Sequence, residues 1–244
     1  MGKVVRFECV VVRSLMTKFV PCLDILPAAQ RRLWTELNEI PPEFVLYGGT
    51  AIALHLGHRE SVDFDFFGSE TFDPSKLEPK MPFMANAQIT QRGPNTLTGS
   101  VDRDGLVKVS FFGVPNIGHL RPPHIAEDNG LKVASLLDLA GTKVSVVQAR
   151  AEAKDYIDID ALMRTGSVDL PTALAAGRAI YGPEFNPQIT LKALSFFGEG
   201  NLRNLPEDMK SRLVTAAREV DLDRLPKIDD AREPKKKIER GRER

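Results

Sequence analysis

The sequence is poor in the residues that cross-link extracellular folds or bind zinc. Only two cysteines and four histidines occur among its 244 residues. Cys9 and Cys22 lack the spacing of metal ligands and are typical of free thiols in a reducing compartment, so a disulfide framework is not expected. His55 and His58 stand three residues apart, but no further histidine or cysteine completes a zinc site around them.

Long apolar runs and a net charge are also missing. No run approaches the roughly 20 apolar residues that are needed to span a bilayer. Arg6, Glu8 and Arg13 interrupt the valines near the N-terminus, which makes a poor signal peptide. We therefore expect a cytoplasmic protein with no membrane partner. Lys+Arg and Asp+Glu both number 33, so the overall charge gives no attraction to nucleic acid and only local patches could provide one.

The two ends of the chain differ in composition from the middle. The composition becomes typical of a folded domain only from about Leu23, so residues 1–22 are predicted to be an N-terminal extension. We hypothesise that Met16 is the true start, an idea that an intact Met1 in protein from the native host would contradict. Residues 226–244 are predicted to be a basic, disordered tail, because positions 231–244 hold seven basic and three acidic residues and no apolar anchor.

The spacing of apolar residues predicts two different halves. In residues 23–134 strands and helices alternate, whereas residues 135–225 have helical spacing throughout. Strands are predicted over 44–47, 62–67, 87–90, 96–101, 106–112 and 131–134, and helices over 27–38, 50–56 and 74–80. Residues 115–129 are predicted to be a loop. The expected fold class is α/β (α+β), a mixed sheet with flanking helices followed by a helical C-terminal half.

The helical half has a clear start signal. Ser135 is a plausible N-cap with Asp138 three residues later, which forms a loose capping box. The apolar residues that follow keep helical spacing, and Gly166 closes the second run. Further helices are predicted over 171–180, 189–197 and 207–220.

The most informative segment of the chain is residues 44–67. It is typical of a strand, a glycine turn at Gly48-Gly49, a short helix and a second strand that carries Asp63 and Asp65. Side chains alternate along a strand, so the two aspartates share one face. A helix N-terminus next to them favours anions. Two carboxylates beside a turn that can hold phosphate predict a site for Mg²⁺ and a nucleotide.

Each of these features also has a structural explanation. A Gly-Gly pair before a helix is more often only a tight turn, and two aspartates on a strand are more often an acidic solvent face. The combination shifts the balance, because the 14 residues that separate the turn from Asp63 suffice for a short helix and a return to the neighbouring strand.

These motifs resemble a known signature. The chain is similar to the DNA polymerase beta-type nucleotidyltransferase superfamily, and a longer match resembles its AbiEii/AbiGii branch, which includes toxins of toxin–antitoxin systems. The matching residues are Gly48-Gly49-Thr50, Leu54-His-Leu-Gly-His-Arg59, Ser61 and Asp63-Phe-Asp65. The resemblance implies a nucleotidyltransferase-like domain over residues 23–134.

The resemblance also implies roles for these residues. Asp63 and Asp65 would be catalytic and bind two Mg²⁺ ions. The nucleotide-binding residues would be Gly48, Gly49, Thr50, Arg59 and Ser61. Two divalent ions would neutralise the charge that develops when a hydroxyl attacks the α-phosphorus and pyrophosphate leaves.

The match departs from the superfamily at one position. A third carboxylate usually stands on a later strand, whereas the corresponding strand here, over 106–112, has Ser110. The helical half offers a substitute that resembles the later motifs of the branch. Lys143 would neutralise a nucleotide phosphate, and Asp155 would orient or deprotonate the acceptor or support the metal site. A charged helix surface is the alternative for Lys143, Arg150 and Asp155.

The sequence therefore predicts Mg²⁺-dependent transfer of a nucleoside monophosphate from an NTP to a hydroxyl acceptor. The resemblance implies tRNA or a protein as the acceptor and, for a toxin, a cognate antitoxin as partner. Two alternatives remain open. One is transfer to a small molecule, as in antibiotic-modifying relatives. The other is a degenerate member that binds a nucleotide or a partner without turnover, which Ser110 favours.

Overall fold

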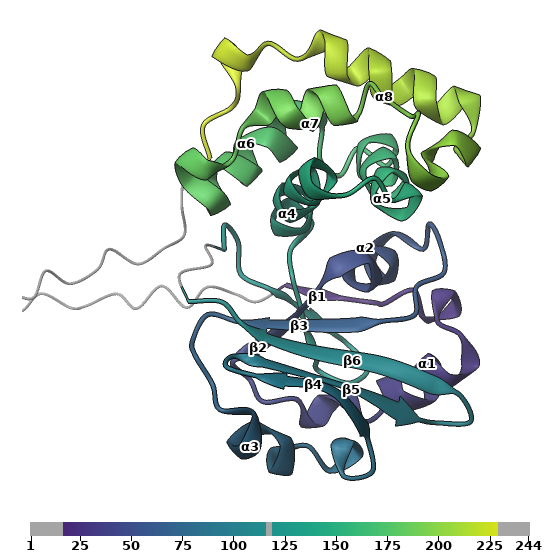
Figure 1. Ribbon diagram of the computed structural model, residues 1–244, viewed down its shortest axis with the longest axis vertical. Coiled ribbons are helices and arrows are strands. Elements are labelled where there is room, and N and C mark those ends of the chain that lie inside the picture. Colours follow the sequence, from purple (N-terminus) through teal and green to yellow (C-terminus); the bar gives the residue numbers. More distant parts are fainter. Residues whose placement is uncertain (1–16, 116–118, 229–244) are drawn as a thin grey trace, which may run out of the picture.

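A mixed sheet and a helical layer make up the protein. The computed structural model describes residues 17–115 and 119–228. Figure 1 shows the sheet with helices α1 (Ala28–Trp34) and α3 (Pro74–Leu77) at one end of the molecule and helices α4 to α8 at the other. Helix α2 (Gly48–Leu56) lies between them and contacts both α4 and α5. Predicted residues that fall on 1–16 and 229–244, the proposed start at Met16 among them, lie outside the described part of the chain.

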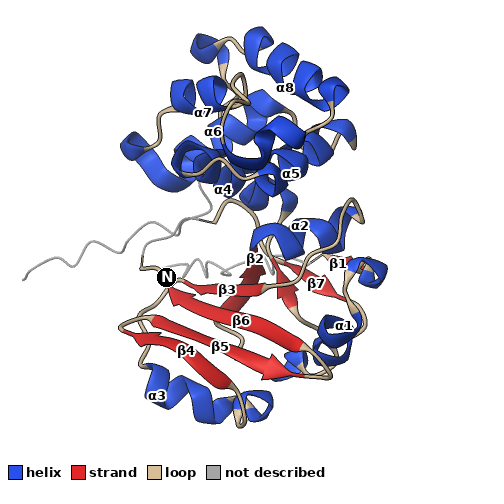
Figure 2. Cartoon of the chain, turned by 45° about the vertical axis from the view of Figure 1, so that its right-hand side comes forward, coloured by secondary structure: helices blue, strands red, loops and turns tan. Residues whose placement is uncertain are grey.

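The sheet combines parallel and antiparallel pairs in the order β1-β7-β8-β2-β3-β6-β5-β4. Its central strand β3 pairs antiparallel with β2 and parallel with β6. The strands are β1 (Lys18–Phe19), β2 (Phe44–Tyr47), β3 (Phe64–Gly68), β4 (Gln88–Gly93), β5 (Thr96–Asp102), β6 (Leu106–Gly113), β7 (His124–Ala126) and β8 (Lys132–Val133). Figure 2 shows these strands as one twisted layer. The predicted mixed sheet with flanking helices is confirmed.

Alternation along β3 divides its side chains between two environments. Phe64 and Phe66 are fully buried, and the ring of Phe66 stacks on Phe111 of β6 with centroids 5.2 Å apart. Trp34 of α1 packs on the same side, 6.3 Å from Phe64. Asp65 lies on the opposite face of β3, toward α2 and the helical half. The aromatic face anchors the strand in the core and thereby fixes the position of the acidic face.

Five helices form the second half. They are α4 (Leu136–Ala149), α5 (Ala153–Arg164), α6 (Leu170–Tyr181), α7 (Pro187–Ala193) and α8 (Glu207–Glu219). As predicted, the Ser135 hydroxyl caps α4 by accepting a hydrogen bond from the Asp138 amide at 3.1 Å. Gly141 brings α4 close to α6, since a Cβ there would lie 2.9 Å from Ala176. None of the described helices is both long and apolar enough to cross a membrane.

Two short strands correct the sequence interpretation. Strand β7 lies within the segment predicted as a loop over 115–129, and β1 lies within the predicted extension over 1–22. The two strands pair in parallel at the edge of the sheet, where Phe19 is opposite Ala126. Strands of two or three residues are too short to show alternation, so they could not be predicted from apolar spacing. The division into domains over 23–134 and 135–225 stays a prediction.

Candidate active site

A pocket of about 390 Å³ lies where the sheet, α2 and the helical half meet. Its walls come from β2, β3 and β6, from the start of α2 and the loop after it, and from α4, α5 and the end of α6. All nine site residues predicted from the sequence line this pocket: Gly48, Gly49, Thr50, Arg59, Ser61, Asp63, Asp65, Lys143 and Asp155. The fold thus brings together two groups of residues that lie about 80 positions apart in the chain.

Gly48 allows α2 to begin directly at the end of β2. Its φ of 76° is in the left-handed region, which glycine adopts without strain. A Cβ at this position would stand 3.3 Å from an Asp65 carboxylate oxygen. No side chain caps the first turn of α2. The amide end of a helix therefore adjoins the carboxylate of Asp65, an arrangement that suits an anion bound together with a cation.

Gly49 is required for a different reason. A Cβ there would lie 2.2 Å from Nη2 of Arg59 and 3.3 Å from Oδ2 of Asp158. The missing side chain therefore leaves room for an ion pair that crosses the start of α2. The sequence assigned Gly49 to phosphate contact, whereas the structure shows that it also accommodates Arg59.

Thr50 and Ser61 hold the loop that leads into β3. Their hydroxyls are buried and lie 2.7 Å apart. The Thr50 hydroxyl also donates to the backbone carbonyl of Asp63. These bonds tie the first turn of α2 to the residue before β3 and so fix the position of Asp63. Both hydroxyls line the pocket, but their contacts within the protein make them positioning groups.

Asp65 on β3 and Asp63 directly before the strand are both half-buried and line the same pocket. No salt bridge among the described residues holds either carboxylate. Burial raises the pKa of Asp65 above its ordinary value of 3.8, and the neighbouring charge of Asp63 adds to the effect. In the register of the sheet, Asp65 is opposite Tyr47 of β2 and Ser110 of β6. Ser110 therefore stands beside the aspartates, at the strand position where the resemblance led us to look for a third acid.

Helix α5 presents two further aspartates whose side chains are fully buried. Asp158 accepts hydrogen bonds from His58 at 2.7 Å and from Arg59 at 2.6 and 3.0 Å. Lys143 of α4 lies 2.9 Å from the same carboxylate. Burial alone would raise the pKa of Asp158, but the bonds from His58 and Arg59 and the charge of Lys143 outweigh it and lower the pKa.

Asp155 is one turn earlier on α5 and is paired in the same way. It accepts bonds from Arg150 at 2.8 and 3.1 Å and lies 2.9 Å from Nζ of Lys143. Burial opposes its ionisation, but the Arg150 bonds and the Lys143 charge lower its pKa below 3.8. A carboxylate with a lowered pKa and two cationic partners is a weak proton acceptor. The sequence left open that Asp155 orients the acceptor, deprotonates it or supports the metal site. Deprotonation does not fit this geometry, and the contacts of Asp155 show instead that it holds Lys143 and Arg150.

The network makes a basic wall opposite the sheet aspartates. Lys143 forms ion pairs with Asp155 and Asp158, and Arg59 forms an ion pair with Asp158. Two further lysines line the pocket, Lys154 of α5 and Lys108 of β6, which lies on the sheet beside the aspartates. Their charges lower the pKa of Asp65 against the effect of burial. The sequence did not assign Lys108 to the site. Lys108 could have been found from its place two residues before Ser110, on the same face of β6.

The donor set suits a magnesium ion that is shared with a substrate. Mg²⁺ binds through one or two carboxylates together with substrate phosphates and water. Asp63 and Asp65 provide two such carboxylates without a basic partner in salt-bridge contact. Among residues 17–115 and 119–228, no group of three or more His, Cys, Asp or Glu side chains is arranged to hold a metal on its own. The residues therefore fit an ion that takes its remaining ligands from phosphate.

The chain is similar to known proteins in sequence and in fold. The chain is 32% identical over 130 residues to an uncharacterised protein of Aquifex aeolicus (strain VF5), a match that covers 52% of this chain and 61% of that protein. Among solved structures, it resembles MenT4, a nucleotidyltransferase toxin from Mycobacterium tuberculosis H37Rv. The TM-score is 0.53 and the identity 15%, with 82% of this chain and 84% of that one covered.

A second solved structure has the same fold. It is described as a candidate nucleotidyltransferase from H. pylori and matches with a TM-score of 0.51 and 16% identity, over 78% of this chain and 92% of that one. The family described as "Nucleotidyl transferase AbiEii toxin, Type IV TA system" matches residues 32–234, which include the whole pocket. The chain belongs to this AbiEii family of nucleotidyltransferase toxins.

Proposed function

We propose that the protein transfers a nucleoside monophosphate from an NTP to a hydroxyl acceptor with the help of Mg²⁺. The observation that supports the proposal best is the pair Asp63 and Asp65, which lies beside the uncapped start of α2 in a pocket that is also lined by basic residues. Carboxylates on one side and cations on the other match the two parts of a metal-bound triphosphate.

Each side of the pocket has its own task. The first-turn amides of α2, with Lys143, Arg59 and Arg150, would bind and orient the triphosphate. Asp63 and Asp65 would hold Mg²⁺, which when bound neutralises charge on the phosphates and lowers the pKa of the acceptor hydroxyl. The acceptor oxygen forms a bond to the α-phosphorus, the bond to the β-phosphate oxygen breaks, pyrophosphate leaves and the hydroxyl proton passes to water.

The α5 aspartates would act through the cations that they hold. Lys143 has three rotatable donors and can contact phosphate only if its position is fixed. The carboxylates of Asp155 and Asp158 fix it from two sides. The same aspartates orient Arg150 and Arg59. This division of roles leaves proton abstraction to solvent or substrate, since Ser110 replaces the acid that would otherwise accept the proton.

The reaction is tested with each NTP labelled at the α-phosphate. The full chain is incubated with Mg²⁺ and, separately, with tRNA, with protein extract or with small hydroxyl compounds. Label in one of these fractions, lost when EDTA is added, supports transfer and identifies the acceptor class. Absence of label from every fraction while NTP still binds contradicts the proposal. That outcome favours the degenerate binding protein, for which the serine at position 110 is the supporting observation.

The family also implies an antitoxin partner, and we propose a toxic role that depends on transfer. Induced expression in a bacterial host would arrest growth with the wild-type chain and would not with Asp65→Ala. If both chains arrest growth equally, toxicity does not depend on the residues of the pocket. Rescue by a gene neighbouring this one in its native genome would identify the antitoxin.

A further inference from the structure

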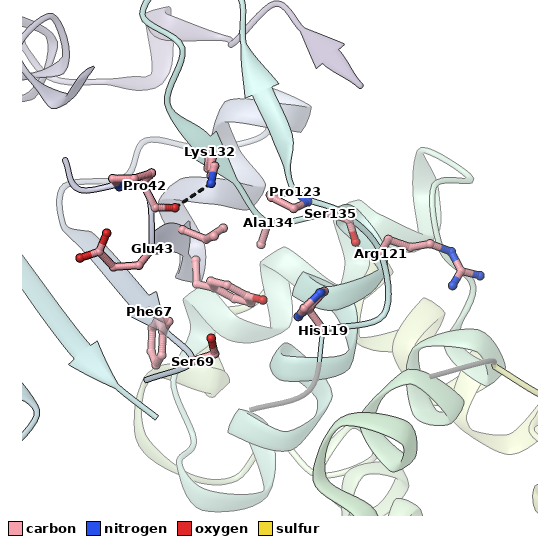
Figure 3. Close-up of a pocket in the computed structure, with 12 residues that line it drawn as sticks. Pro42, Glu43, Phe67, Ser69, His119, Arg121, Pro123, Lys132, Ala134 and Ser135 are labelled. Carbon is pink, nitrogen blue, oxygen red and sulfur yellow. Dashed lines mark hydrogen bonds between the residues drawn. The ribbon is translucent and has the colours of Figure 1, made fainter. Parts of the chain in front are cut away.

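A second pocket, of about 210 Å³, opens next to the candidate active site (Figure 3). Tyr47 and Phe67 line both pockets, so the two pockets are adjacent. The second pocket continues from there toward β8 and the loop that precedes β7. None of the predicted site residues lines it.

The strand β3 connects the two pockets by its register. Asp63, Asp65, Phe67 and Ser69 alternate with buried residues, so they follow one another on a single face. Two residues along a strand span about 6.6 Å. A ligand group held at Asp65 therefore has the Phe67 ring as its next neighbour on this face, and Ser69 lies beyond it in the second pocket.

Phe67 offers a fixed aromatic surface. Its side chain is half-buried, with the Tyr47 ring 5.4 Å away on β2 and the Phe112 ring 5.1 Å away on β6. Neighbours on both sides hold the ring in place, while the pocket leaves part of it accessible. A half-buried ring at the edge of a polar pocket is a typical platform for a nucleobase, because stacking requires only an open π-face.

The rim of the pocket is basic. Arg121 and Lys132 line it, and Glu43 is the one acid among the described lining residues. In Figure 3 the carboxylate of Glu43 is turned away from the cavity, and the guanidinium of Arg121 extends outward from its edge. Lys132 donates a 2.6 Å hydrogen bond to the Pro42 carbonyl, which holds its ammonium group at the rim. Lys132 at the rim and Arg121 beyond its edge provide cations for a phosphate that extends outward from a base over the Phe67 ring.

We propose that this second pocket binds one nucleobase stacked on Phe67, with an adjoining phosphate near Arg121 and Lys132. The proposal rests on the proposed function, since it takes the aspartates of the first pocket as the place of transfer. A base can come from the NTP itself or from the last residues of a nucleic-acid acceptor. Both share the same chemistry, and the experiment distinguishes the two sources.

The test measures binding, so it does not require turnover. The full chain is titrated with the four α,β-methylene NTP analogues, from which pyrophosphate cannot leave, and with fluorescein-labelled octauridylate and octaadenylate RNA. Phe67→Leu keeps an apolar side chain but removes the π-face. We expect it to raise the Kd for one class of ligand about 5- to 150-fold, the range measured for loss of a base–aromatic stack. Phe67→Trp should restore the affinity.

Matched controls come from the helical half. Phe196 is 57% exposed and lies outside both pockets, so Phe196→Leu should leave every Kd unchanged. Arg164, on the last turn of α5, serves as the control for Arg121 in the same way. If the strand of RNA occupies the pocket, Arg121→Ala should also reduce the salt dependence of RNA binding by about one phosphate contact, and Arg164→Ala should not.

The possible results separate cleanly. A change confined to the analogues identifies the base as that of the NTP, and a change confined to RNA identifies an acceptor strand; either result supports the proposal. Unchanged Kd values for both ligands in Phe67→Leu and Arg121→Ala overturn it. If circular dichroism shows that Phe67→Leu is unfolded, the Kd values of Arg121→Ala and Lys132→Ala are used to test the proposal instead. The proposal is also overturned if label is transferred to protein and the Kd values for RNA and for the NTP analogues are the same in Phe67→Leu, Arg121→Ala, Lys132→Ala and the wild type. Failure of transfer with ligand binding intact contradicts only the proposed function.

Discussion

Two pairs of aspartates lie at the same pocket in opposite states, although Asp158 does not line it and only contacts the lining residues Arg59 and Lys143. Asp63 and Asp65 on the sheet have no basic partner in salt-bridge contact, and the pKa of Asp65 is raised. Asp155 and Asp158 on α5 are fully buried, each contacts Lys143 and at least one arginine, and the pKa of each is lowered. The residue type is the same in both pairs, so the surroundings alone decide what each carboxylate can do.

The comparison separates binding from positioning. The two carboxylates of the sheet pair repel each other, which lowers the stability of the fold. Because no protein cation is in salt-bridge contact with them, they are available to bind a metal ion. A carboxylate that protein cations already satisfy cannot take that role, and instead holds those cations in place. Changes to the sheet pair should therefore lower transfer strongly and change the stability of the fold only slightly, and changes to the α5 pair should lower the stability first.

The largest effect is expected for transfer when the sheet pair is removed. Asp63→Ala or Asp65→Ala should lower the rate of transfer at least about a thousandfold, because metal stabilisation of the transition state contributes several kcal/mol. Incorporation of labelled nucleotide measures the rate. Glu70, an exposed acid just after β3, provides the control Glu70→Ala, which should keep full activity. Activity that survives in both aspartate variants would remove the metal assignment.

The next largest effect concerns the stability of the α5 pair. Asp158→Ala leaves the buried charges of Arg59 and Lys143 with one partner fewer, and loss of one member of a buried ion pair costs about 3–5 kcal/mol. Chemical denaturation of the full chain measures the free energy of unfolding. Asp208, which pairs with Arg212 but has a side chain that is 72% exposed, serves as the control, and Asp208→Ala should change little. If the two variants have equal free energies of unfolding, the ion pairs of Asp158 do not stabilise the fold.

A smaller effect is expected from a single methyl group at Gly49. Gly49→Ala should destabilise the fold by about 1–3 kcal/mol, since the added Cβ would meet the Arg59 guanidinium. Gly93→Ala in β4, where nothing lies within 4 Å of the added atom, should stay within about 0.5 kcal/mol of wild type. In an Arg59→Ala background the cost at Gly49 should shrink, and a double-mutant cycle measures the coupling. If Gly49→Ala lowers the free energy of unfolding equally in both backgrounds, the loss comes from a change in α2 and not from a clash with Arg59.

The smallest effect is a difference in pH dependence between the pairs. A raised folded pKa means that the stability from Asp65 is full below its ordinary value of 3.8 and is lost as the pH rises through the folded value. Asp65→Asn should therefore raise the Tm in EDTA at neutral pH and have no effect in strong acid. The lowered pKa of Asp158 has the opposite sign, with stability present above 3.8 and lost as the pH falls.

Thermal denaturation from pH 3 to 8 tests whether the stabilities from Asp65 and Asp158 change in opposite directions with pH, with Asp158→Asn as the matched variant. That variant should lower the Tm most at neutral pH, where Asp65→Asn raises it. Added Mg²⁺ should then stabilise the wild type and not Asp65→Asn. Curves that shift in the same direction for the two variants would contradict the contrast between the pairs.

Much of the site could be predicted from the local spacing of residues in the sequence. Alternation placed Asp63 and Asp65 on one face of β3, and Ser135 was correctly predicted to cap α4. Three contacts were not accessible. The pairing of His58 and Arg59 with Asp158 joins positions about 100 residues apart, and the bond between the Thr50 and Ser61 hydroxyls depends on how the loop folds back. The edge strands β1 and β7 were too short to leave a periodic signal.

The sequence by itself determined the family, the longer strands and helices, and nine of the residues that line the pocket, because these depend on spacing along the chain. Only the tertiary structure decided which aspartates are satisfied by protein cations and which are left for a ligand. The charge state of a carboxylate depends on burial and on neighbours within a few ångströms, and those neighbours come from segments that the sequence keeps far apart.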